Sequence, residues 1–151
     1  MSDLTEFLLA RVAEDEAAAR EATPGPWWNE SGTVHAPFPF GRDLSAGPGG
    51  ACHPLDAQGG NGRDADAEVE HAARWNPARV LAECEAKRLI VALHHPASAA
   101  DHGSLSEGRC FTCVDFHADY DCEQSTLPCW TLRALAQPYA AHPDYRPEWR
   151  P

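Results

Sequence analysis

Four of the six cysteines of this 151-residue chain fall within one stretch of twenty residues, and this clustering constrains the fold more than any other feature. Cys110 and Cys113 form a Cys-x-x-Cys pair, and Cys122 and Cys129 follow at short range. The spacing is typical of a zinc knuckle, in which thiolates bind the metal tetrahedrally at about 2.3 Å. Cys129 also stands at a predicted helix start, where the helix dipole favours a thiolate. We therefore expect a structural Zn²⁺ within residues 110–129.

The fourth ligand of this site has competing candidates. Cys122 is nearest in sequence, thiolate binds zinc better than a protonatable imidazole, and a short loop loses little entropy on closure. Against it, the acidic residues around Cys122 would raise the pKa of its thiol unless a metal offsets them. His94, at the end of a long predicted helix, is the main alternative, and His95 and His117 are two more. The predicted ligand set is Cys110, Cys113, Cys122 and Cys129.

The charge of the chain argues against several classes of partner. The formal net charge is −11, from 12 basic and 23 acidic residues, and no basic cluster compensates locally. Because nucleic-acid affinity comes chiefly from Lys and Arg, we expect no nucleic-acid binding and no docking on anionic membranes. No signal peptide is recognisable, and no segment approaches the roughly 20 apolar residues of a membrane-spanning helix. We expect a cytoplasmic protein, whose reduced thiols favour metal binding over disulfides.

The pattern of apolar residues predicts a small α+β protein, with residues 1–151 forming a single domain. The expected helices cover residues 3–21, 64–74, 77–94 and 131–137. Strand-compatible residues between Trp27 and Phe40 predict a small irregular sheet. Residues 47–62 are rich in glycine and predict a flexible loop.

Local signals support these helices. An amphipathic stripe with helical spacing marks the first one and consists of Leu4, Phe7, Leu8 and Val12. Asn76 as the cap and Pro77 at the first helical position mark the start of the third helix. Cys84 lies on the apolar side of that helix, and we expect it to be buried as a small hydrophobic residue. The aromatic residues of the C-terminal tail are expected to pack across another element, and they are Tyr139, Tyr145 and Trp149.

Other chemistries fit the cysteine cluster less well. Cys110 and Cys113 could form a thioredoxin-like redox pair, but the flanking residues predict neither the strand nor the helix of that motif. The paired motifs of zinc deaminases, the H-E-x-x-H motif and the phosphate-binding loop are absent from the sequence. Cys–His hydrolysis is a further possibility, although no pattern singles out a base. The alternative function is therefore a small metal- or thiol-dependent enzyme with its site around His94, Cys110 and Cys113.

Three segments resemble those of a domain-of-unknown-function family of small proteins from actinobacteria and their phages. They are ATPGPW after the first helix, the NPARVLAECEAKRLIVALHH helix, and the C-terminal PCWTLRALAQPYAAHPDYRPEW. The family pattern carries over onto the Cys-x-x-Cys pair at Cys110 and Cys113 and onto His94 after the long helix. The resemblance implies no activity and favours an accessory protein of these organisms or their mobile elements. Together with the cysteines, it leads us to expect a zinc-stabilised module that interacts with a protein partner.

Overall fold

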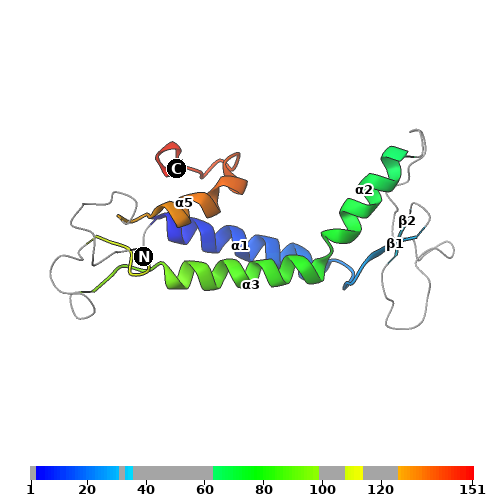
Figure 1. Cartoon of the computed structure of the whole chain (residues 1–151), viewed down its shortest axis with the longest axis horizontal. Helices are drawn as coiled ribbons and strands as arrows, with labels where there is room; N and C mark the ends of the chain where they lie inside the picture. The colour runs from blue at the N-terminus through cyan, green and yellow to red at the C-terminus, as the bar shows by residue number, and fades with distance from the viewer. Residues whose placement is uncertain (1–2, 31–32, 36–62, 99–107, 114–125) are drawn as a thin grey trace. The chain divides into compact units, whose positions relative to one another are not determined.

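The computed structural model describes residues 3–30, 33–35, 63–98, 108–113 and 126–151 (Figure 1). The chain divides into two compact units: unit 1 comprises Met1–Glu14 and Cys84–Pro151, and unit 2 comprises Asp15–Glu83. The prediction of a single domain over residues 1–151 is not tested by this division and stays a prediction. The predicted flexible loop, residues 47–62, lies outside the described residues.

Helices make up most of the described structure, which confirms the predicted α+β class with four helices and a small sheet. The elements are α1 (Asp3–Glu21), β1 (Trp28–Glu30), β2 (Thr33–His35), α2 (Arg63–Arg74), α3 (Pro77–Leu93), α5 (Trp130–Ala136), η3 (Gln137–Tyr139) and η4 (Pro147–Trp149). The bounds of the four α-helices each lie within one residue of their predicted positions, whereas η3 and η4 were not predicted. None of the described helices is long and apolar enough to span a bilayer.

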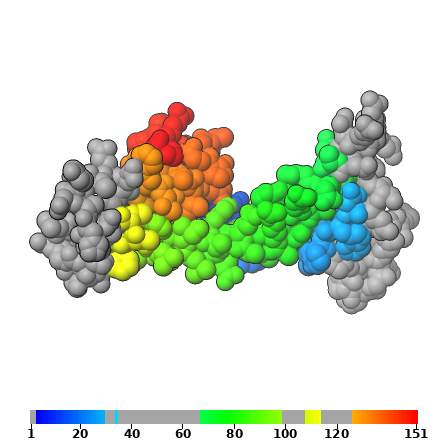
Figure 2. Space-filling view, viewed as in Figure 1, coloured from blue at the N-terminus to red at the C-terminus, as the bar shows by residue number. Residues whose placement is uncertain are grey.

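The hydrophobic core of unit 1 joins residues from both ends of the sequence. The apolar stripe on α1 is buried, and its members Leu4, Phe7 and Leu8 pack with residues of α3 and α5. Figure 2 shows the orange α5 and the yellow segment 108–113 gathered at one end of the green α3. The buried members of this cluster are Leu4, Phe7, Leu8, Val91, Cys110, Cys129, Leu132, Ala136 and Trp149. Two of the predicted metal ligands are therefore part of the core.

The C-terminal segment packs around Phe7 of α1. The ring of Phe7 meets Tyr139 and Tyr145 edge-on, at centroid distances of 6.4 and 6.0 Å, and lies 5.0 Å from the ring of Trp149. Such tilted and edge-on aromatic pairs are favourable beyond the area they bury. The predicted packing of the three tail aromatics across another element is confirmed.

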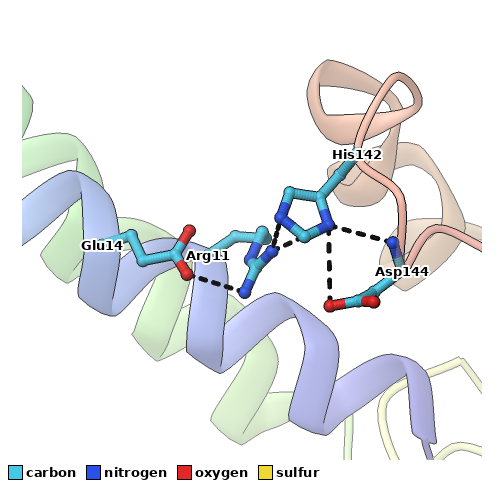
Figure 3. Close-up of polar contacts among 4 residues, drawn as sticks. All are labelled: Arg11, Glu14, His142 and Asp144. Carbon is cyan, nitrogen blue, oxygen red and sulfur yellow. Dashed lines mark hydrogen bonds and ion pairs between the residues drawn. The ribbon is translucent and has the colours of Figure 1, made fainter.

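A buried arginine adds a polar contact between α1 and the same segment (Figure 3). Arg11 is only 9% exposed, and its Nη1 contacts both ring nitrogens of His142. Its Nη2 donates to Glu14 Oε1 at 2.8 Å. The backbone N–H of Asp144 donates to His142 Nδ1 at 3.1 Å and so orients the ring. These contacts hold residues 142–144 against α1.

Unit 2 is built on a two-stranded antiparallel sheet. Trp28 pairs with His35, and Asn29 pairs with Val34. Helix α2 packs against both strands and buries Val69 and Ala73. Residues 31–32 and 36–40 of the predicted sheet region lie outside the described residues.

The start of α3 follows its sequence signal. Asn76 Oδ1 accepts a hydrogen bond from the backbone N–H of Arg79 at 3.2 Å, and Asn76 Nδ2 donates to the carbonyl oxygen of Ala73 at 3.0 Å. The first bond caps the helix, as predicted, and the second links α3 to the end of α2. Gly25 lies against this cap, since a Cβ atom there would come within 2.6 Å of Asn76 Oδ1 and 3.2 Å of Ala78 Cβ.

We expect the substitution Gly25→Ala to lower the free energy of unfolding by about 1–3 kcal/mol, because the added methyl group overpacks the cap. Chemical denaturation of wild type, Gly25→Ala, Asn76→Ala and the double variant measures this effect. Asn76→Ala alone should cost about 0.5–2 kcal/mol, as loss of a helix cap does. The double variant should lose less stability than the sum of the two single variants, because the Asn76 side chain, which clashes with the added methyl group, is then absent. Strict additivity of the two changes in stability would show that the close contact between residue 25 and Asn76 does not require glycine.

Candidate metal centre

Three segments of unit 1 supply the residues of the candidate site. His94 directly follows α3, and its backbone N–H still donates to Ile90 in the last helical turn, at 3.1 Å. Cys110 and Cys113 lie on a turn that follows Gly108, whose φ of 77° falls in the left-handed region that glycine adopts without strain. Cys129 immediately precedes α5, as the sequence predicted.

Short antiparallel pairings fix these segments beside one another. Pro96 pairs with Cys110, and Arg109 pairs with Thr126, as isolated bridges. The backbone hydrogen bonds run from Ala97 N to Arg109 O, from Phe111 N to His95 O and from Leu127 N to Gly108 O, with lengths of 2.8–2.9 Å. Backbone pairing therefore sets the separation between the end of α3, the Cys-x-x-Cys turn and the start of α5.

One imidazole nitrogen lies close to all three sulfur atoms of the cluster. His94 Nδ1 is 3.3 Å from Cys110 Sγ, 3.4 Å from Cys113 Sγ and 3.5 Å from Cys129 Sγ. The four potential ligand atoms all lie within 4.8 Å of one another. This Cys₃His cluster could hold a metal ion.

Burial shifts the pKa values of His94, Cys110 and Cys113. It lowers the pKa of the His94 imidazole, because lost solvation disfavours the charged ring. It also raises the pKa of the Cys110 thiol. Burial, together with the negative charges that Cys129 and Cys110 would carry, raises the pKa of Cys113 to about 12. At neutral pH a bound cation must therefore displace protons from these thiols, so metal affinity rises with pH.

The structure brings together three of the four predicted ligands, Cys110, Cys113 and Cys129. The fourth group in the described cluster is His94, the main alternative to Cys122 in the sequence analysis. Cys122 and His117 lie outside the described residues, so the preference for Cys122 is untested. His95 is not part of the cluster: its ring stacks on Phe111 at 4.8 Å between centroids, and its Nδ1 bonds the carbonyl oxygen of Pro96 at 2.9 Å.

Two threonines support the site and were not anticipated from the sequence. The hydroxyl of Thr112, inside the Cys-x-x-Cys turn, donates to the carbonyl oxygen of Leu93 and so ties the turn to the end of α3. The hydroxyl of Thr131 lies 4.0 Å from Cys113 Sγ. Each threonine is within two residues of a cysteine, and this proximity was the only available signal.

Comparison with known proteins identifies a family but no activity. A family model described as "Family of unknown function (DUF6221)" matches residues 1–151, the whole sequence. The chain belongs to this family. No curated protein and no solved structure matches the chain. The membership confirms the expected resemblance to a family of unknown function.

Proposed function

We propose that unit 1 is a binding module stabilised by a structural zinc ion, with His94 Nδ1, Cys110, Cys113 and Cys129 as the four ligands. The observation that carries the proposal is the separation of 3.3–3.5 Å between His94 Nδ1 and each of the three sulfur atoms. In a tetrahedral site with Zn–S near 2.3 Å and Zn–N near 2.0–2.1 Å, the nitrogen and sulfur ligands stand roughly 3.5 Å apart.

The donor set favours zinc over harder cations. Thiolate and imidazole select zinc and other borderline or soft metals, whereas Mg²⁺ and Ca²⁺ prefer oxygen ligands. Cys110 and Cys129 are fully buried, which suits a metal that has no contact with substrate. Four protein ligands leave no position for water, and this favours a structural zinc over the alternative of a metal-dependent enzyme. None of the described cysteines forms a disulfide bond, in keeping with a cytoplasmic location.

The proposed role is interaction with a protein partner, in an accessory protein of actinobacteria or their phages. Large apolar side chains are exposed in unit 1: Leu89 and Leu93 lie one turn apart on α3, and each is about 60% exposed. Trp130, next to Cys129, is 50% exposed. Exposed leucine and tryptophan side chains are typical components of protein interfaces. The net charge of −11 continues to argue against nucleic acid and anionic membranes as partners.

Elemental analysis tests the metal and its ligands together. Protein purified without chelator should contain about one zinc per chain, as a single tetrahedral site requires. The variant His94→Ala should lose this zinc, while Cys122→Ser and the matched control His95→Ala should keep it. Loss of zinc in Cys122→Ser but not in His94→Ala would restore the all-thiolate site. A wild-type zinc content near zero would overturn the proposal.

A further inference from the structure

The three thiols of the metal centre differ in their access to solvent. Cys110 and Cys129 are fully buried, at 0% exposed, whereas Cys113 is only partly buried. The susceptibility of a cysteine to oxidation follows its thiolate character and its exposure, and a metal ligand is held as the thiolate. Cys113 is therefore the sulfur of the centre that a small oxidant in solution reaches first.

A second thiol lies within reach of Cys113. The ligand atoms of the cluster all lie within 4.8 Å of one another, so two of its sulfur atoms need to approach by about 3 Å or less to form a disulfide. Cys110 and Cys113 lie on the same turn, and a bond between them requires movement within that turn alone. A bond to Cys129 would instead displace the start of α5. Cys110 is therefore the favoured partner of an oxidised Cys113.

The Cys-x-x-Cys turn is attached to the end of α3 by bonds that do not involve the metal ligands' side chains. The backbone N–H of Phe111 donates to the carbonyl oxygen of His95 at 2.8 Å, and the hydroxyl of Thr112 donates to that of Leu93. These bonds persist when the metal leaves, so the turn stays beside His94. The site can then bind a metal again once its thiols are restored.

We propose that the metal centre is a peroxide-sensitive switch, in which hydrogen peroxide converts Cys110 and Cys113 to a disulfide and thereby releases the metal. The Cys113 thiolate first attacks one peroxide oxygen, the O–O bond breaks, and the other oxygen leaves as water, which produces a sulfenic acid on Cys113. The Cys110 thiolate then attacks the sulfenic sulfur, the S–O bond breaks, and a second water forms. The two thiolates lose two electrons to the peroxide, and two protons are taken up from solvent.

The switch rests on the proposed zinc centre, because the zinc ion holds these sulfur atoms as thiolates. Disulfide formation removes two of the four ligands, and His94 and Cys129 alone do not complete a tetrahedral site. Because metal binding is coupled to folding, unit 1 loses the stability that the metal supplies. The proposed interaction module thus becomes sensitive to oxidising conditions.

Zinc release from the zinc-loaded protein tests this proposal. Hydrogen peroxide should release the zinc to a chromogenic chelator, with about two thiols lost per zinc released, as one disulfide requires. Mass spectrometry of protease digests, after alkylation of the remaining thiols, should find the disulfide between Cys110 and Cys113. Dithiothreitol and added zinc should restore the metal content, and catalase added before the peroxide should prevent the release.

Two variants that each keep four potential ligands identify the reactive thiols. Cys113→His replaces the partly exposed sulfur by an imidazole, and we expect its zinc release by peroxide to be slower than that of wild type by about tenfold or more. Cys129→His is the matched variant, because it keeps both thiols of the turn, and it should release zinc within about threefold of the wild-type rate. Cys84→Ala, outside the cluster, should behave as wild type does.

Zinc is quantified in every sample before peroxide is added. Zinc-loaded wild type that keeps its metal at millimolar peroxide, forms its disulfide with any other cysteine, or releases zinc no faster than Cys113→His would overturn this proposal alone. If the histidine variants do not hold zinc, the disulfide mapped in the wild-type protein decides. Wild-type protein purified without zinc would instead overturn the proposed function.

Discussion

Substitution of Cys110 by Ser should abolish zinc binding and lower the free energy of unfolding of unit 1 by several kcal/mol. Cys110 is fully buried and belongs to the core cluster as well as to the metal centre. Structural zinc binding in small domains is worth about 10 kcal/mol or more at neutral pH, and this free energy is coupled to folding. Thermal melts followed by circular dichroism, with zinc measured on the same samples, check the result.

Cys84 provides the matched control for this substitution. It is as deeply buried as Cys110, at 1% exposed, but it is not part of the metal-ligating cluster. Cys84→Ala should keep a full complement of zinc, because Cys84 does not belong to the cluster. If Cys110→Ser melts like Cys84→Ala and retains its zinc, then the cluster does not hold the fold together.

Substitution of Trp149 by Ala should destabilise the protein by about 3–5 kcal/mol, the range found when large aromatic residues are removed from cores. Trp149 is 5% exposed and packs on Phe7 at 5.0 Å between ring centroids. Its loss removes the contact that joins η4 to α1. Urea denaturation measures the change through the midpoint and the slope of the transition.

Trp130→Ala is the control for this second prediction, because its side chain is half exposed. Surface substitutions of this kind usually change stability by less than about 0.5 kcal/mol. Equal destabilisation by the two tryptophan variants would mean that Trp149 does not anchor the C-terminal segment to α1.

The helices could be predicted from the sequence because their signals are local. Asn76 and Pro77 specify a helix start with their own side chains, and the stripe on α1 follows helical spacing within one element. The burial of Cys84 followed from its position on the apolar side of α3. These features depend on residues a few positions apart, so no knowledge of the tertiary structure was needed.

The candidate site could be predicted only in part. The spacing of Cys110, Cys113 and Cys129 indicated a metal centre, and the structure brings these thiols together. The proximity of His94 depends on the pairing of residues 95–97 with 108–111, which spacing alone does not reveal. In the sequence analysis, the small loss of loop-closure entropy favoured the neighbouring Cys122 as the fourth ligand. In the structure, backbone pairing already places His94 against the cysteines, so metal binding by His94 requires no further loss of chain entropy. The contact between Arg11 and His142, 131 residues apart, left no local signal at all.

Unit 1 is built from two separate stretches of the sequence, and this has a consequence for how the chain folds during synthesis. Its core requires α1 at the start of the sequence and Trp149 near the end, while the residues of unit 2 come from the single continuous stretch Asp15–Glu83. Domains tend to fold as they leave the ribosome, and contacts between distant residues form slowly. Unit 2 can therefore fold before the residues that pack against the apolar stripe of α1 have been synthesised. Until residue 149 emerges, that stripe is an exposed hydrophobic surface, which we expect to be the point at which the nascent chain is most vulnerable to aggregation.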